Sequence, residues 1–553
     1  MLPLLLLAAP DTWAFSPGKD DPKAELLVDL RPLNEKKAGA KGFVKSDGGT
    51  GFALGDGSPV RFWCVNSFVG REAEWTDRPR WPKGKPDLAR HARFLAQRGV
   101  NMVRLHAHIN PSPKQRLEDI NADERDWIWR AVAAYKKEGI YTTISPYFVL
   151  DMRLGKDWGI DGPTDAPPFG LLFLEPKLQE AYKAWWRKLL EPKNPHTGVP
   201  LSKEPAVAIL QLQNEDSLLF WTLGTLKPES KKRLESLFAG WAETRYGSRE
   251  KAEAAWGKQA GAFSHVWELA QPSKDRRRAD EVRFLCETMH GFNKRMAAYL
   301  KDGLGCKHLV NAGNWKSADP VRLEDAERWS YTATDVLATN RYFGGVHTGK
   351  NAGWAVAAGD EFTRVSALKR PAQLPINVKQ VPGKPMLVTE SGWVMPNGYG
   401  NEGPFLIAAY SSLSGVAGFY WFAVGEEGWS PPKSANGWLD SQAKWPIMTP
   451  DTLGQFPAAA WLYRKGLVKK GEPVLVEERS LDDLWFRRTP LAAESAGFDP
   501  NRDKGELPPG SPKPVGWQAF LAGPVHLGFG GGKSKGADLK KLVDGDAIRS
   551  VTG

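Results

Sequence analysis

Residues 60–465 repeat one pattern: an amphipathic helix, a glycine, and then a short apolar strand. Leu88, His91, Ala92 and Leu95 mark one helical face, which ends at Gly99 ahead of the apolar stretch VNMVRLH. A glycine after the last helical turn can adopt the left-handed conformation that ends a helix. Short, almost continuously apolar strands that alternate with helices are typical of a parallel sheet covered by helices.

Eight such strands can be counted along this region. We expect them at residues 62–67, 100–106, 140–148, 206–213, 307–312, 334–341, 385–390 and 416–423. Eight parallel strands predict a protein of the α/β class with a closed (β/α)8 barrel, the TIM barrel. An open, doubly wound sheet is the alternative, but no Gly-rich phosphate loop follows the first expected strand.

The chain of 553 residues is long enough for the barrel and smaller additions. We expect an N-terminal β segment at residues 16–60, the barrel at 61–466, and a further region at 467–553. In that last region PVLVEERS, LWFRRTP and WQAFLAGPVHLGF are separated by Pro/Gly loops, which predicts a small all-β accessory module. The N-terminal strands can add to it. The chain stops inside an expected strand, AIRSVTG, so we expect the module to be truncated.

Residues 1–15 contain the apolar run LPLLLLAA, then Pro10 and a small residue at Ala14. This arrangement resembles the end of a secretory signal peptide, and we therefore expect a secreted or periplasmic protein. The run is too short to span a bilayer, and we expect no membrane span. The cysteines at 64, 286 and 306 are odd in number and widely spaced, which predicts neither a disulfide framework nor a zinc cluster.

The net charge of +11 comes from 75 basic residues interleaved with 64 acidic ones. Even the dense run at 274–278 has no recognition motif beside it, so we expect no nucleic-acid partner. The 24 tryptophans are more informative, because indole faces can stack on sugar rings as well as fill a core. The sequence does not indicate an oligomeric state.

Active sites of such barrels lie where the strands end at their carboxyl side. The expected strand ends carry polar and aromatic side chains: Arg104 and His106 on the second strand, Asn214 and Glu215 on the fourth, Asn340 and Tyr342 on the sixth, Glu390 on the seventh and Trp421 on the eighth.

With the motifs VRLH, QNE, NRY, VTESGW and FYWF in this order, residues 60–465 resemble glycoside hydrolase clan A. These are retaining (β/α)8-barrel glycosidases, and the similarity is greatest to the cellulase-like family 5 and its relatives. Three positions depart from family 5. Asp216 stands where a proline usually follows the acid/base, Tyr147 replaces a histidine on strand three, and Asn340 replaces a histidine on strand six. The clan is therefore a firmer expectation than the family.

The resemblance implies a retaining hydrolase that cleaves β-glycosidic bonds of oligo- or polysaccharides. Glu215 would be the acid/base and Glu390 the nucleophile. Retention needs two carboxyl groups about 5 to 5.5 Å apart, and strands four and seven face each other across a barrel mouth.

The other strand-end residues have implied supporting roles. Arg104 would lie beside Glu390 and keep the pKa of that carboxyl low. Tyr342 would donate a hydrogen bond to Glu390, Asn214 would bind the sugar 2-hydroxyl, and Trp421 would form the floor of the reacting subsite. Further candidates for hydroxyl binding or stacking are Asn66, His106, Tyr147, Asn314 and Trp393. Each of these residues also has a structural interpretation, as a buried partner or as core.

Two other functions remain open. His106 and His108 have the His-x-His spacing of a metal-dependent amidohydrolase barrel. The further ligands are lacking, since His308 is expected at the wrong end of its strand, and we expect no metal and no cofactor. A non-catalytic carbohydrate-binding barrel that has kept its aromatic platforms is the second alternative.

Overall fold

The computed structural model describes residues 28–71, 86–344, 346–349, 355–429, 441–495, 515–545 and 547–552. The expected signal-peptide remnant at residues 1–15 lies outside these ranges, as do residues 16–27 of the expected N-terminal segment.

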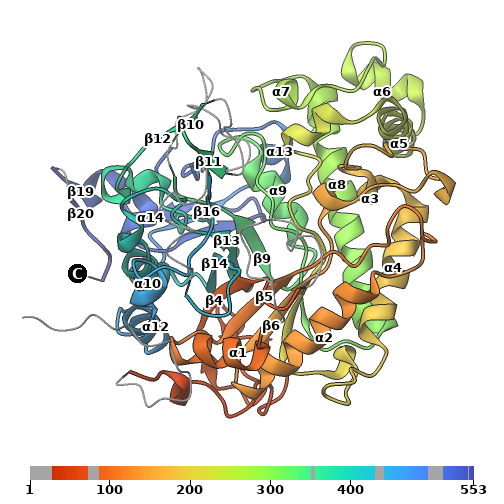
Figure 1. The fold of residues 1–553 in the computed structure, drawn as a ribbon. Coiled ribbons are helices and arrows are strands. Elements are labelled where there is room, and N and C mark those ends of the chain that lie inside the picture. The colour runs from red at the N-terminus through yellow and green to blue at the C-terminus, as the bar shows by residue number, and fades with distance from the viewer. Residues whose placement is uncertain are drawn as a thin grey trace, which may run out of the picture.

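An eight-stranded parallel sheet forms the centre of the fold (Figure 1). Its strands fall at the eight expected places, and the last two extend one residue beyond the expected range: β4 Phe62–Ser67, β5 Met102–His106, β6 Tyr141–Ser145, β7 Val207–Gln211, β8 Leu309–Asn311, β9 Leu337–Asn340, β13 Met386–Ser391 and β14 Gly418–Val424. Their spatial order is β8-β7-β6-β5-β4-β14-β13-β9. The Val336 N–H donates to the Val310 carbonyl at 3.1 Å, and this contact joins the two outer strands. The TIM barrel is therefore confirmed.

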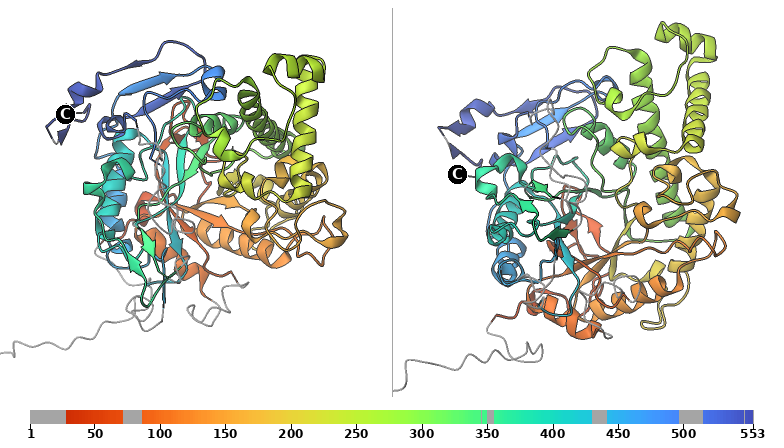
Figure 2. Two further views of the ribbon diagram at one scale, coloured as in Figure 1. Left: turned by 90° about the horizontal axis from the view of Figure 1, so that it is seen from above. Right: turned by 45° about the horizontal axis from the view of Figure 1, so that its top comes forward.

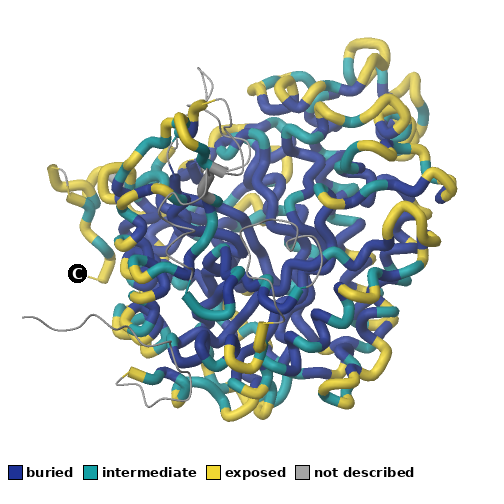
Figure 3. The backbone as a smooth tube through the Cα atoms, viewed as in Figure 1, coloured by how far each residue is buried: buried dark blue, intermediate teal, exposed yellow. Residues whose placement is uncertain are grey.

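Helices surround the barrel and bury its outer face (Figures 1 and 3). They are α1 Leu88–Gln97, α2 Ala122–Lys137, α3 Leu171–Leu174, α4 Pro176–Leu190, α8 Arg276–Ala298, α9 Glu324–Tyr331, α10 Gly403–Ser414 and α12 Phe456–Arg464. Gly139 shows why glycine ends such helices. Its φ is +70°, and an added Cβ would lie 2.0 Å from the Glu35 carbonyl oxygen.

The N-terminal residues close the barrel at the end opposite the expected site. Short antiparallel strands β1 Lys45–Ser46, β2 Phe52–Ala53 and β3 Pro59–Val60 form a sheet there. Phe52 and Leu54 belong to the same apolar cluster as Phe62, Met102 and Leu309, which lie at the N-terminal ends of barrel strands. The described residues before β1 form turns and a short 3-10 helix, Arg31–Leu33, instead of further strands.

A helical insertion follows β7 and forms a lobe beside the barrel (Figures 1 and 2). It consists of α5 Pro228–Tyr246, α6 Arg249–Trp256 and α7 Val266–Leu269, ahead of α8. Two further strand pairs lie in later loops: β10 His347–Thr348 with β12 Glu361–Phe362, and β11 Ala355–Ala357 with β15 Ser441–Ala443.

The C-terminal region contains the expected strands and also two helices. β16 Leu475–Glu478, β17 Val525–Gly528 and β18 Lys535–Gly536 form a sheet, and β19 Val543–Asp544 pairs with β20 Ala547–Ile548. The expected strands LWFRRTP and WQAFLAGPVHLGF are wrong in part: LWFRRTP forms no strand and its first two residues end α13 Leu481–Trp485, while QAFLA forms α14 Gln518–Ala522. Ser480 explains the first, since it caps α13 and bonds reciprocally with Asp483.

No helix within the described ranges is both long and apolar enough to cross a membrane.

Candidate active site

Polar side chains from five barrel strands meet at the carboxyl ends of those strands, around Arg104. The guanidinium of Arg104 is fully buried and makes five hydrogen bonds. It donates to Gln211 Oε1 (2.8 Å), Asn66 Oδ1 (2.8 Å), Glu390 Oε1 (2.8 Å), Ser145 Oγ (3.0 Å) and Asn214 Oδ1 (2.6 Å). Every partner is a side-chain oxygen, so Arg104 holds the whole cluster in one arrangement.

Glu390 is almost completely buried and bonds through both carboxyl oxygens. Oε1 pairs with Arg104, and Oε2 accepts a hydrogen bond of 3.0 Å from the Tyr342 hydroxyl. We expected Arg104 to hold the pKa of Glu390 low, and this expectation is wrong. Burial raises the pKa of Glu390, and the charge of Arg104 and the hydrogen bonds from Tyr342 and Asn340 offset only part of that rise.

Glu215 approaches the same place from β7 with a different environment. Its side chain is partly exposed, whereas that of Glu390 is buried. Its Oε1 accepts a hydrogen bond of 2.8 Å from Asn340 Nδ2, and its N–H donates to Asn314 Oδ1 at 3.0 Å. Its φ is +51°, a backbone conformation that is uncommon outside glycine and that clusters at functional sites.

Asn340 connects the two carboxyl groups. Its amide bonds to Glu215, and a hydrogen bond from the same side chain lowers the pKa of Glu390. The Asn340 Oδ1 accepts from Thr389 Oγ at 2.8 Å, which fixes the orientation of the amide. The sequence placed Asn340 at this strand end but assigned it no role.

Asn214 is left with one unused hydrogen-bond donor. Its Oδ1 accepts from Arg104 and, at 2.8 Å, from Asn314 Nδ2. Its own Nδ2 is buried and has no partner among the described residues. The Asn314 amide donates to Asn214 and accepts from the Glu215 N–H. The Asn66 amide accepts from Arg104 and donates to the Thr389 carbonyl. Asn66 and Asn314 therefore position other residues.

His106 and His108 form a second edge of the mouth. Their rings lie 5.5 Å apart, and His106 also contacts the rings of Phe68 and Phe148. Burial lowers the pKa of both histidines, and nearby arginine charges lower it further, so both are neutral near pH 7. Nδ1 of His106 has no partner among the described residues.

These histidines are not arranged as metal ligands. His108 Nδ1 lies 3.1 Å from an Arg71 guanidinium nitrogen, so a cation already occupies that position. In the described part of the chain, no three His, Cys, Asp or Glu side chains are grouped so that they could hold a metal ion. His308 bonds to the Glu204 carbonyl at the opposite end of β8.

Three aromatic candidates lie away from the mouth. Trp421 is fully buried outside the barrel, against Trp63 and Phe456, because side chains alternate along a strand and its neighbour Tyr420 points inward to bond Thr143. Trp393 stacks on Trp421 and donates to Glu402, and Tyr147 packs against Trp185 of α4. Trp421 was expected as the floor of the reacting subsite, and Tyr147 and Trp393 for hydroxyl binding or stacking; instead each of the three rings packs against another aromatic ring away from the mouth.

Phe422 takes the place that was expected for Trp421. It follows Tyr420 by two residues, so it lies on the inner side of β14. It is half-buried, and its ring lies 6.2 Å from that of Tyr342 and 5.6 Å from that of Phe68. The peptide bond between Phe422 and Ala423 is cis. The alternation of FYWF along the strand was the signal that identified Phe422, once one inward residue was known.

Similar structures include an endo-β-1,4-mannanase from Thermotoga petrophila (14% identity, 76% of this chain and 80% of that one, TM-score 0.41) and a family 5 mannosidase from Rhizomucor miehei (12%, 77% and 98%, 0.43). A third is a β-galactosidase from Halorubrum lacusprofundi (14%, 77% and 61%, 0.47). A glycoside hydrolase barrel is what this chain resembles. No protein-family profile and no curated protein sequence matches it.

Identities of 14% or less leave the reaction to be judged from the mouth's own geometry.

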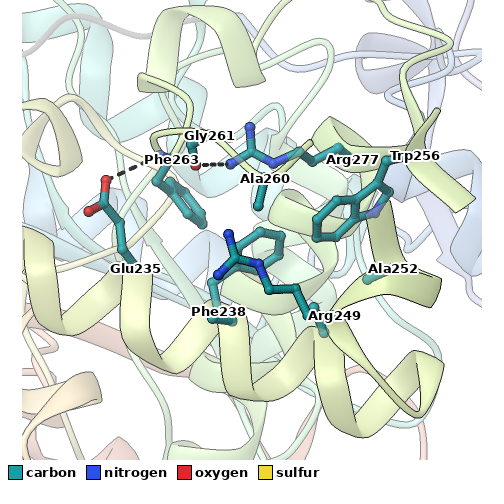
Figure 4. A pocket seen from close by; sticks show the side chains of 11 residues that line it. Glu235, Phe238, Arg249, Ala252, Trp256, Ala260, Gly261, Phe263 and Arg277 are labelled. Atoms are coloured by element: carbon teal, nitrogen blue, oxygen red, sulfur yellow. Dashed lines mark hydrogen bonds between the residues drawn. The ribbon is translucent and has the colours of Figure 1, made fainter. Parts of the chain in front are cut away.

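A cavity of about 140 Å³ lies elsewhere, in the helical insertion (Figure 4). Its walls are the rings of Phe238, Trp256 and Phe263, with Arg249 and Arg277 beside them. None of the strand-end residues lines it, so this cavity is separate from the mouth of the barrel.

Proposed function

We propose that this chain is a retaining glycoside hydrolase that cleaves β-glycosidic bonds of oligo- or polysaccharides by double displacement. The observation that carries the proposal is the pair of carboxyl groups, Glu215 and Glu390, that share the amide of Asn340. Asn340 is also the register partner of Glu390 in the pairing of β9 with β13, so the two glutamates flank one side chain. Two carboxyl groups in that position suit retention, which needs about 5 to 5.5 Å between them, better than the wider spacing of inversion.

The environments of the two carboxyls suit different roles. Arg104 and Tyr342 both bond to Glu390, and each stabilises its ionised form, so Glu390 is the nucleophile that attacks the anomeric carbon. Glu215 is the more exposed carboxyl and acts as the acid that protonates the glycosidic oxygen. After the leaving group departs, Glu215 takes a proton from the water that attacks the glycosyl-enzyme.

Two other side chains suit the reacting sugar. The unused Nδ2 donor of Asn214 would bind the 2-hydroxyl, a contact that strengthens in the transition state. Phe422, next to Tyr342, would supply an apolar wall against the sugar ring. No observation favours the amidohydrolase alternative, because an arginine occupies the position beside His108.

Glu390→Gln tests the proposal. In this variant, the rate of cleavage of any verified aryl glycoside or polysaccharide should fall by roughly four orders of magnitude or more, because no covalent intermediate can form. The wild-type product, followed by proton NMR, should first appear with the anomeric configuration of the substrate. Glu402→Gln, which changes a carboxylate bonded to Trp393 outside the mouth, is the matched control and should keep the wild-type rate.

Glu215→Ala tests the acid/base separately. With an activated leaving group the first step should survive and the second should slow, and azide should then restore turnover as a small nucleophile that needs no base. Full activity in Glu390→Gln, or an inverted product, would contradict the proposal. Oligosaccharide binding without turnover in the wild type would instead favour a carbohydrate-binding barrel.

A further inference from the structure

Arg341 lies between the two residues that contact the carboxyl pair. On one side Asn340 bonds to Glu215, and on the other Tyr342 bonds to Glu390. The backbone N–H of Arg341 itself donates to the Glu390 carbonyl at 3.0 Å. Any shift of the Arg341 backbone would therefore move both contacts at once.

The side chain of Arg341 points away from the mouth and is held by the C-terminal region. Successive side chains of an extended segment alternate, so Asn340 and Tyr342 share one side and Arg341 takes the other. Arg341 Nη1 pairs with Glu494 Oε2 at 2.7 Å, and Nη2 donates to the Ser495 carbonyl (2.8 Å) and hydroxyl (2.9 Å). Arg341 is 5% exposed and Glu494 is 1% exposed.

Glu494 is itself fixed on its other side. Its Oε1 pairs with Arg328 of α9 at 2.8 Å and accepts a hydrogen bond of 2.7 Å from the Lys379 N–H. Both carboxyl oxygens are thus committed in a buried place. Movement of Glu494 would leave the buried guanidinium of Arg341 without its paired anion and Arg328 with Glu324 alone, which is a strongly unfavourable arrangement.

The pair belongs to a larger buried cluster of balanced charge that joins the barrel to the C-terminal region. Its cations are Arg328, Arg341, Lys379 and Arg479, and its acids are Glu324, Asp325, Glu477 and Glu494. Glu477 on β16 pairs with Lys379, and Arg479, which directly follows β16, pairs with Asp325. Of the C-terminal acids in this cluster, Glu494 is the one that pairs with Arg341.

We propose that Glu494 and Ser495 are positioning residues for the reaction. By holding Arg341 they fix the segment Asn340–Tyr342, and through it the placement of both carboxyl groups. The C-terminal region is then part of the catalytic unit, although none of its residues in this cluster contacts the pair of glutamates directly. This inference rests on the proposed function, since it assigns an effect on the turnover of a glycoside.

Glu494→Gln is the central variant, because it keeps the size of the side chain and removes its charge. We expect kcat to fall roughly 10- to 100-fold, the loss typical of small misplacements of catalytic groups. KM should change by no more than about twofold, since the substrate-binding donors stay in place. Ser495→Ala, which leaves the backbone carbonyl bond to Arg341, should lower kcat by only about threefold.

Glu477→Gln is the matched control. It removes a similarly buried carboxylate from the same cluster, but that carboxylate bonds Lys379 and the Leu491 N–H and not Arg341. It should lower the melting temperature to a similar extent and leave kcat near the wild-type value. A double-mutant cycle completes the test, because Glu494→Gln should have no further effect on kcat once Arg341 is replaced by Gln.

An unchanged kcat in Glu494→Gln, or an equal fall in Glu477→Gln, would overturn the inference while leaving the proposed function intact, provided that Glu390→Gln is inactive. If the wild type cleaves no glycoside, the proposed function fails. In that case a crystal structure of Glu494→Gln still tests whether Glu494 holds Asn340 and Tyr342 in place. We expect Tyr342 and Asn340 to lose their contacts with the two glutamates, and an unmoved pair would refute it.

Discussion

Three carboxyl groups in this part of the barrel, those of Glu215, its neighbour Asp216, and Glu390, lie in three different environments. Glu215 is partly exposed and bonded to an amide, Glu390 is buried with a guanidinium and a phenol, and Asp216 is buried with backbone N–H groups alone. Their chemistry follows from these surroundings rather than from residue type. The Gly170 N–H lies 3.0 Å from both carboxyl oxygens of Asp216, and burial raises the pKa of Asp216 to about 7.

Asp216 should therefore make the stability depend on pH. Its pKa rises from 3.8 in the unfolded chain to about 7 in the folded protein, so the folded state keeps a proton that the unfolded state has lost. Stability from this group is present below pH 4 and is lost as the pH rises towards 7. Asp216→Asn should abolish this decline, which is on the order of a few kcal/mol. Urea unfolding at pH 5 and pH 8 measures it, and an equal decline in the variant would contradict the assignment.

At the scale of elements, the loop after β7 extends the mouth on the side of Glu215. Phe220 packs against Trp315, which follows Asn314, the residue bonded to the Glu215 N–H. The next residue, Trp221, contacts Trp267 on α7, and Trp267 is 49% exposed. In a retaining glycosidase the acid/base lies beside the leaving group, so leaving-group sugars would run along this side.

Trp267→Ala should distinguish long from short substrates. Loss of one stacking ring costs about 1 kcal/mol, which predicts a roughly fivefold lower kcat/KM on a polysaccharide. An aryl glycoside too short to reach α7 should be cleaved at the wild-type rate. Trp461→Ala on α12, where the ring is 44% exposed, is the control and should change neither rate. Equal losses on both substrates would place Trp267 outside a sugar path.

At the scale of the whole molecule, the C-terminal region is not an independent appendage. Its strand β17 contacts Gln380, and its charged residues complete the buried cluster with α9. Charged side chains of the barrel pair with side chains more than 95 residues further along the chain. Arg341 and Glu494, which are 153 residues apart, are one example.

A chain that ends at residue 466 should consequently fail to fold. It would keep Arg328, Arg341 and Asp325 buried without Glu494 and Arg479, and breaking a buried pair costs about 3 to 5 kcal/mol each. Two such losses approach the total stability of a typical domain, about 5 to 15 kcal/mol. Expression of the truncated chain, followed by circular dichroism and thermal melting, tests this. A soluble product with a cooperative transition would show that the barrel stands alone.

The strands and helices of the barrel were readable from local pattern. Strand and helix periods, together with the glycines that end the helices, determine which segments become strands, and parallel strands bring their carboxyl ends to one edge. That is why Arg104, Asn214, Tyr342, Glu215 and Glu390 were placed correctly at a common mouth.

What tertiary structure decided is the direction and surroundings of individual side chains. Whether Trp421 or Phe422 faces the mouth depends on the register of β14 in the sheet, because a shift of one residue exchanges the inner and outer side chains. The alternation of residues along the sequence does not set that register. The raised pKa of Glu390 depends on burial, because desolvation by the folded chain exceeds the effect of the adjacent arginine charge. The contact between Arg341 and Glu494 depends on packing between distant segments. No local pattern encodes such a contact, since its energy exists only when both partners are buried together.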